Sequence, residues 1–338
     1  MKSKSIISLL FLGLVLSACG TTSESSEPSV TSEDVTSQEP TTSEQPVTSE
    51  EPVTSEQPVT SEDVTSEEVT SEQPVTSEDP IISPSIEFTI AEPYDGTFWD
   101  GLNLTLEGEA LRTHLNQFMW ARFTKIDYNT VSSAVREMDQ DPSNTNNVLS
   151  LYDLHSVPKS QQNYVWNREH VFPQSKLADG NSSLRAAPTT KNISSDAANI
   201  FAADNDLNTK RSNYSFIDLD LEEKYEPYTI YNSFGTRTDN FIYRGYFAPT
   251  QKIRGELARA QLYMIVMYPD NASVSENFSL ADMLRWNIEF APTVERDMQR
   301  NAGLEKWQDL RNPFIDMPEL GCQVFGDFNA STKNVCGL

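Results

Sequence analysis

Histidine, cysteine and glycine are scarce in this chain of 338 residues, which contains three, three and thirteen of them. Cys322 and Cys336 lie fourteen positions apart with no histidine near them, so their spacing excludes a structural zinc site. The sequence also lacks a glycine-rich phosphate loop and an alternation of strand and helix patterns. These absences exclude a wound parallel sheet that binds nucleotides through such a loop.

Residues 21–80 contain no lysine, arginine or aromatic residue and sixteen acidic residues. A unit of the type Val-Thr-Ser-Glu-Gln-Pro recurs there, and each unit has too little apolar surface to offset the entropy of ordering. We expect a flexible, extended stalk; a low-complexity expansion without a role is the alternative. The stalk explains much of the net charge of −25, because residues 81–338 have a net charge of −11.

The N-terminus has the pattern of an export signal. A basic start at Met1–Lys4 precedes an apolar run over 6–16, which is too short for a comfortable transmembrane helix. Leu16-Ser17-Ala18-Cys19-Gly20 resembles the lipobox of bacterial lipoproteins, in which the cysteine carries a lipid. An uncleaved apolar N-terminus with an incidental cysteine is the alternative. The expected organisation is a signal peptide over 1–18, a lipid-anchored stalk over 19–83 and a catalytic domain over 84–338.

The folded region shows helical spacing of apolar residues over 109–120, 128–138, 255–268 and 280–290, with a further candidate over 293–301. Residues 148–152 have the composition of a strand, and regular structure is expected to end near 311–314. The prediction is an α+β fold in which helices dominate. Export of the domain leaves two states open for Cys322 and Cys336, a disulfide or two free thiols.

Two stretches contain the residues that could take part in catalysis or metal binding. The first is Trp166-Asn167-Arg168-Glu169-His170-Val171-Phe172-Pro173-Gln174-Ser175, and the second contains Asp196-Ala197-Ala198-Asn199-Ile200 and continues to Asn213. Together they supply a base, a carboxylate, amide oxygens and cations, as a metal-assisted phosphodiester hydrolase requires. The other histidines are weaker candidates, because His114 lies in a predicted helix and His155 in a predicted loop.

Neighbouring residues on a regular strand point to opposite faces, so Glu169 and His170 share a site only at a strand end, bulge or turn. Pro173 makes such an end credible. The alternative for this segment alone is a structural one, with Arg168 paired to Glu169 in a loop and His170 merely hydrogen-bonded.

Several motifs in a fixed order along the chain argue against this structural alternative. Trp166–Ser175, Asp196-x-x-Asn199-Ile200 and Asn208-x-x-Arg211-Ser212-Asn213 resemble the bacterial endonuclease I family, and the resemblance covers nearly all of 94–316. That family belongs to the ββα-metal (His-Me finger) nucleases. The resemblance implies this motif within a mostly helical single domain.

The resemblance also implies roles for individual residues. His170 would be the general base, and Glu169 and Asn208 would bind a divalent metal, with Mg²⁺ expected and Ca²⁺ or Mn²⁺ as alternatives. Arg185 is the preferred phosphate contact and Arg211 the second candidate. Relatives often have a histidine where this chain has Ala198, which removes a support hydrogen bond or a phosphate contact.

The resulting hypothesis is a monomeric endonuclease anchored by lipid to the extracellular face of the membrane. Its expected substrate is DNA, with RNA as an alternative, cleaved without sequence specificity through backbone phosphates. The competing hypothesis is a surface lipoprotein with little or no activity that binds nucleic acid or acts as an adhesin. The acidity of the domain favours the competing hypothesis, and the intact Glu169, His170 and Asn208 favour the enzyme.

Overall fold

The computed structural model describes residues 86–219, 228–273 and 279–338. Every described residue belongs to one compact unit, Gln73–Leu338. The expected signal segment, Cys19 and the stalk lie outside the described residues and stay predictions. Among the described helices, none has the length and apolarity needed to cross a membrane.

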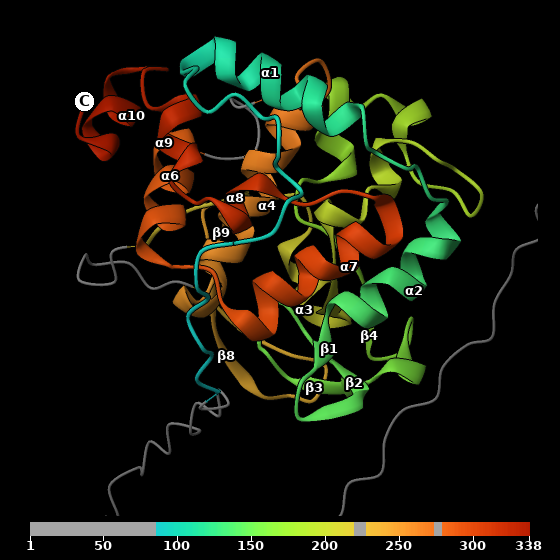
Figure 1. Cartoon of the computed structure of the whole chain (residues 1–338). Helices are drawn as coiled ribbons and strands as arrows, with labels where there is room; N and C mark the ends of the chain where they lie inside the picture. Colours follow the sequence, from blue (N-terminus) through green and yellow to red (C-terminus); the bar gives the residue numbers. More distant parts are fainter. Residues whose placement is uncertain (1–85, 220–227, 274–278) are drawn as a thin grey trace, which may run out of the picture. The chain divides into compact units, whose positions relative to one another are not determined.

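The described unit is α+β (Figure 1). Its α-helices are α1 Gly108–Trp120, α2 Tyr128–Met138, α3 Asn205–Arg211, α4 Arg254–Met267, α6 Leu280–Glu289, α7 Gln299–Gln308, α8 Pro313–Asp316, α9 Leu320–Phe325 and α10 Ala330–Cys336. Its strands are β1 Gln140–Asp141, β2 Asn144–Leu149, β3 Ser156–Pro158, β4 Trp166–His170, β5 Ile200–Asp204, β6 Ser215–Phe216, β7 Tyr228–Tyr231, β8 Arg237–Tyr243 and β9 Tyr246–Ala248.

Helix α4 forms the centre of the core because all of its side chains are buried. It packs against α1, α6 and α8, which surround it in Figure 1. A helix that is apolar on every side is stable only when other elements cover all its faces. Its few polar side chains, such as Glu256 and Arg259, are therefore held in buried ion pairs.

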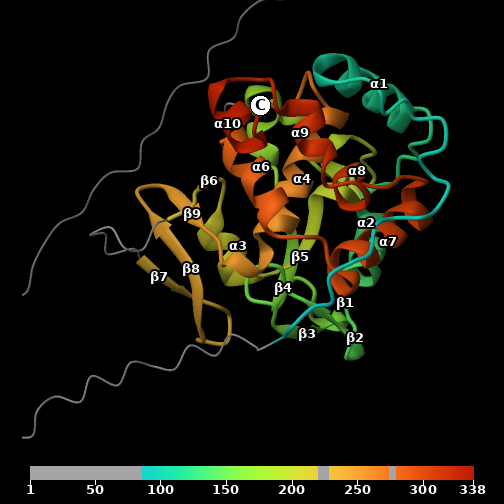
Figure 2. The ribbon, with the colours of Figure 1, turned by 60° about the vertical axis from the view of Figure 1, so that its left-hand side comes forward.

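The strands form three separate sheets with the orders β1-β2-β3, β4-β5 and β6-β9-β8-β7. Figure 2 shows β4 and β5 between the four-stranded sheet and helices α2 and α7. A two-stranded sheet is marginal by itself. The outer edge of β5 therefore needs partners other than a third strand.

Loop and side-chain groups supply these partners. Ala202 N–H donates to Asp139 Oδ2 at 2.6 Å, and Ala202 O accepts from Leu151 N–H at 2.8 Å. Arg300 donates to the carbonyl of Ile200 at 2.9 Å and is ion-paired with Asp139. These bonds fix β5 from the side that β4 does not cover.

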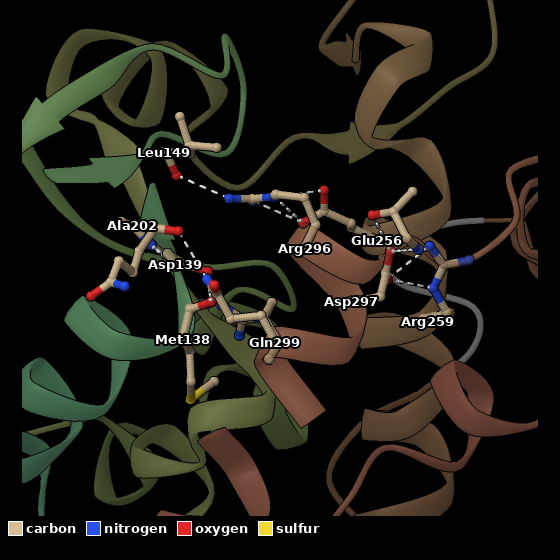
Figure 3. Close-up of polar contacts among 12 residues, drawn as sticks. Met138, Asp139, Leu149, Ala202, Glu256, Arg259, Arg296, Asp297 and Gln299 are labelled. Atoms are coloured by element: carbon tan, nitrogen blue, oxygen red, sulfur yellow. Dashed lines mark hydrogen bonds and ion pairs between the residues drawn. The ribbon is translucent and has the colours of Figure 1, made fainter. Parts of the chain in front are cut away.

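The same helix–strand junction contains two further buried ion pairs (Figure 3). Arg296 contacts Glu256 with its closest N–O distance at 2.8 Å, and it also donates to the carbonyl of Leu149 at 3.2 Å. Arg259 pairs with Asp297 at 2.8 Å. Removing one partner of such a pair leaves a buried charge without compensation, so the network holds α4, the π-helix Val294–Met298 that precedes α7, and the strands in one arrangement.

Four predicted helices are present within a residue or two of their expected bounds. The predicted strand over 148–152 ends at Leu149, because Leu154 N–H donates to the carbonyl of Ser150 and closes a turn. The candidate over 293–301 is longer than expected and runs as a π-helix over Val294–Met298 into α7.

Two parts of the fold differ from the prediction. Regular structure continues beyond 311–314 through α8, α9 and α10, and a disulfide between Cys322 and Cys336 joins the last two. The four-stranded sheet was also not predicted, so the unit is not the mostly helical domain expected. The inward positions Thr238 and Asn240 of β8 are polar, and the strand lacks the alternation that signals a half-buried strand.

Candidate active site

Strands β4 and β5 and helix α3 form one continuous local unit. β4 pairs antiparallel with β5, with His170 opposite Ile200 and Trp166 opposite Asp204. Asp204 then caps α3 by accepting from the N–H groups of Asp206 and Leu207. Because α3 runs back along β4, Asn208 lies beside Asn167, with its amide nitrogen 2.5 Å from the Asn167 oxygen.

His170 is the last residue of β4, so the strand end required by the sequence is present. Asn199 fixes the turn beyond it, accepting from Phe172 N–H at 2.7 Å and donating to Phe172 O at 3.0 Å. An open pocket follows this turn, lined by Arg168, Glu169, His170, Pro173, Gln174, Ser175, Asn208, Arg211, Ser212 and Asn213. The structure therefore brings four of the five predicted site residues into one pocket, and Arg185 is not among its lining residues.

The Glu169 side chain is only 3% exposed. Its Oε1 accepts from the Tyr152 hydroxyl at 2.6 Å and lies 3.2 Å from an Arg211 guanidinium nitrogen. Burial raises the pKa of the Glu169 carboxyl, while Arg211 and the Tyr152 hydroxyl oppose that rise. Within the described part of the chain, both of these side-chain contacts fall on Oε1, so Oε2 can face a ligand.

The His170 ring is held from both nitrogens. Nε2 lies 2.9 Å from the carbonyl oxygen of Ser194, which can only accept, so Nε2 carries the hydrogen and Nδ1 presents its lone pair. Gln174 Nε2 lies 3.1 Å from Nδ1, and Ala186 N–H donates to Gln174 Oε1 at 2.6 Å. The ring also stacks on Tyr128, with centroids 5.7 Å apart.

Burial lowers the pKa of His170 to about 4, and the bond to Ser194 opposes this only in part. The ring is therefore neutral near pH 7, as a general base must be. The nearby guanidinium groups of Arg168 and Arg211 lower the pKa further.

This pKa gives a test of the buried state of His170. Between pH 6.5 and about 4 the unfolded chain binds a proton that the folded chain excludes, so stability falls as the pH drops through this window. We expect His170 to account for a loss of about 3 kcal/mol in unfolding free energy. Urea unfolding of the metal-free protein at a series of pH values, compared with His170→Asn, measures it. An equal pH dependence in both proteins would show that the ring is not buried and neutral.

Arg211 is almost completely buried and is committed to contacts within the fold. Besides Glu169, it donates to the carbonyl of Val171 at 2.6 Å and to that of Ser212 at 3.1 Å, and its guanidinium packs 4.7 Å from the centre of the Phe216 ring. These contacts hold the Glu169 carboxylate against the end of β4. The geometry suits a positioning residue better than a mobile phosphate contact.

Arg185 has a different environment. It is exposed, and it precedes Ala186, whose N–H donates to Gln174. Because Gln174 also contacts His170, the Arg185 backbone is tied to the edge of the site while its charged group faces solvent. Ala198 is 3% exposed and lines a separate cavity with Glu256 and Arg300, so a phosphate contact from this position is not supported.

The oxygen donors fit a hard divalent cation. Such ions take carboxylate and amide oxygens and complete their shell with water, and Mg²⁺ often uses only one or two protein ligands. Glu169 Oε2 and the Asn208 side-chain oxygen are the groups that would hold it. Within the described residues no cluster of three or more His, Cys, Asp or Glu is suited to a metal, so a site here depends on water and phosphate oxygens for the remaining positions.

Sequence reasoning assigned no contact role to four residues around His170 and Glu169. They are Tyr152, Gln174, Ser194 and Asn199, of which Ser194 acts through its backbone carbonyl. Gln174 and Asn199 lie within the two motif stretches, and this position was the signal that could have identified them as site residues. Ser194 could not be found this way, because any residue type supplies a carbonyl.

These features define an α+β protein with a histidine, a carboxylate and an amide in one pocket. The chain belongs to the Endonuclease I family, whose family model matches residues 107–319, a span that contains all five predicted site residues. It is similar to an extracellular ribonuclease of Bacillus amyloliquefaciens, with 31% identity covering 64% of this chain and 74% of the relative. An extracellular ribonuclease of Bacillus subtilis (strain 168) is 29% identical, covering 70% of this chain and 81% of the relative. The family and relative names indicate a nuclease, that is, a phosphodiester hydrolase.

Proposed function

We propose that this protein is an exported, metal-dependent endonuclease that hydrolyses phosphodiester bonds of RNA and DNA without sequence specificity. The observation that carries the proposal is the single pocket that joins His170, Glu169 and Asn208. In this proposal β4, β5 and α3 are the ββα-metal finger. Both relatives are named ribonucleases, which supports RNA as a substrate. Anchoring through Cys19 and a monomeric state stay predictions.

In the proposed reaction, His170 Nδ1 takes the proton from the attacking water. The bond from Nε2–H to Ser194 O then strengthens as the ring becomes charged, and it keeps the ring in place. Nδ1 has one lone pair, which Gln174 contacts in this structure, so water can bind there only when the Gln174 amide moves aside. The bound phosphate supplies the negative charge that stabilises the imidazolium in this buried position.

Glu169 and Asn208 line the same pocket as the His170 ring, and their oxygens are the proposed metal ligands. A divalent cation held there would neutralise the phosphate and assist departure of the leaving oxygen. Tyr152 and Arg211 fix the Glu169 carboxylate through Oε1, so Oε2 keeps one direction. Arg185 is proposed to contact the phosphate from solvent.

Cleavage by the full chain, followed with Mg²⁺ and with EDTA on RNA and on plasmid DNA, tests the proposal. We expect Glu169→Gln to require about 10- to 100-fold more Mg²⁺ for half-maximal cleavage, because Gln keeps the shape and the Tyr152 bond but loses the charge. Asp206→Asn, on the exposed side of α3, is the matched control and should behave as wild type.

An unchanged Mg²⁺ titration would remove Glu169 from the ligand set. Cleavage that survives EDTA would contradict metal dependence. Binding of nucleic acid without cleavage by the wild type would instead favour the inactive surface lipoprotein.

A further inference from the structure

Three cations beside helix α2 differ in their pairing from most arginines of the helical part. Most arginines of the helical part are ion-paired with carboxylates, among them Arg254, Arg259, Arg296, Arg300 and Arg311. Within the described residues, none of the ion pairs involves Arg136, Lys159 or Arg168. These three cations are therefore available to an external anion.

The three cations follow a seam between α2 and the segment 159–168. At one end Arg168 donates to the carbonyl of Tyr128, the first residue of α2. In the middle Gln162 Nε2 donates to Ser132 Oγ at 3.2 Å. At the far end Lys159 Nζ donates to Gln140 Oε1 at 2.6 Å, just beyond α2. The two segments run in opposite chain directions and their contacts do not cross, so the seam is continuous.

Arg136 lies on the face of α2 that forms this seam. It continues the i, i+4 row that starts at Tyr128 and passes through Ser132, and it lies roughly 12 Å along the helix from Tyr128. It is half-buried, and its Nε has no hydrogen-bond partner among the described groups. Burial lowers the pKa of both Arg168 and Lys159. Tyr128 raises the pKa of Arg168 and Glu137 raises that of Lys159, while Arg136 lowers both, so Arg136 lies near both side chains.

The carboxylates beside the seam are occupied by other groups. Glu137 is paired with Lys306 at 2.6 Å and accepts from the Trp307 indole at 3.1 Å. Asp139 is held by Arg300, and Asp141 accepts from the Ser156 hydroxyl. Lys306 and Arg300 offset the charges of Glu137 and Asp139, so the three cations of the seam outnumber the carboxylates there that lack a cationic partner.

Arg168 connects the seam to the active pocket. It lines the pocket beside His170, and its guanidinium stacks on the Tyr128 ring at 3.6 Å from the centroid, which fixes its direction. We propose that Arg168, Arg136 and Lys159 form a phosphate track that binds the sugar–phosphate backbone of the nucleic acid strand leaving the active pocket. That the bound strand is one leaving the pocket rests on the proposed function of that pocket.

The phosphate track binds by charge alone. Arg and Lys contacts to phosphates position a strand without carrying sequence information. Each cation that neutralises a phosphate releases condensed counterions, so binding weakens as the salt concentration rises. The track thus provides the affinity for a polyanion that the overall composition does not suggest.

The test measures binding apart from cleavage. Fluorescence anisotropy of a labelled 12-nucleotide RNA with the full chain in EDTA, over a range of KCl concentrations, gives the slope of log affinity against log salt. We expect Arg136→Gln and Lys159→Gln each to lower this slope by roughly 0.7 to 1 and the affinity about five- to tenfold at 0.1 M salt. With Mg²⁺, KM should rise and kcat should not change, because neither residue lines the pocket.

Lys333→Gln, which removes one charge from α10, is the matched control. Lys159→Arg should keep the wild-type slope, which separates loss of charge from loss of the Lys159 bonds. Slopes of both glutamine variants equal to that of Lys333→Gln, with RNA still cleaved in Mg²⁺, would overturn the track and leave the nuclease proposal standing. Lowered slopes without any wild-type cleavage would support the track and contradict the nuclease proposal.

Discussion

Replacing His170 by alanine is expected to lower the cleavage rate of RNA and DNA by about 10²- to 10⁴-fold, the usual contribution of a positioned base. His170 Nδ1 is the ring nitrogen that faces the pocket, and Ser194 O keeps the other nitrogen protonated. The proposed metal and phosphate contacts would remain in the variant, so a residual rate above that in water is expected. Single-turnover cleavage at saturating Mg²⁺ measures the effect.

His155→Ala is the control for this experiment. His155 stacks on Phe234 with centroids 4.6 Å apart and lines a different pocket, so its removal should leave the rate within about twofold, since it supplies no base to the reaction. Equal activity of His170→Ala and wild type would reject His170 as the base. A large loss in His155→Ala instead would move the base to that residue.

Replacing Arg211 by alanine is expected to destabilise the protein by about 3–5 kcal/mol, the cost of leaving a buried charge without its partner. Glu169 would remain buried beside the vacated space, and the carbonyls of Val171 and Ser212 would lose their donor. Part of this cost disappears if Glu169 takes up a proton, and the protonated form is a poor metal ligand. Arg211→Ala should therefore lose both stability and Mg²⁺-dependent cleavage.

Urea unfolding in EDTA and cleavage in Mg²⁺ measure the two losses separately. Lys210→Ala, at the exposed neighbouring position on α3, should change neither. Arg185→Ala should keep wild-type stability and lower cleavage only, because its side chain is exposed. If Arg211→Ala were as stable as wild type, the ion pair with Glu169 would not hold in solution.

The parts of the fold that local chemistry determines could be predicted from the sequence. Helix α2 has its predicted bounds because Asp127 caps it by accepting from Thr130 N–H and its apolar residues recur at helical spacing. The strand end at His170 followed from the need for two neighbouring side chains to reach one site. Glu169, His170 and Asn208 could be proposed as site residues because they lie close in sequence to recognisable neighbours, and the structure brings them to one pocket.

The parts that depend on distant contacts could not be predicted. Asp139 and Arg300 are 161 positions apart, and nothing near either residue indicates the other. That Arg211 is buried and Arg185 exposed could not be predicted for the same reason, because the burial of Arg211 depends on Phe216 and on the end of β4. The C-terminal helices were missed because α8 and α9 are only four and six residues long.

The bonds along the outer edge of β5 also set an order of events during synthesis. Arg300, which donates to Ile200 and pairs with Asp139, leaves the ribosome well after β4, β5 and α3 have emerged. Until then, the strand that precedes α3 lacks part of its support. A nascent chain that stops before α7 therefore carries all the pocket residues without the frame that aligns them. If the pocket cleaves nucleic acid as proposed, its residues are aligned only after α7 has been synthesised.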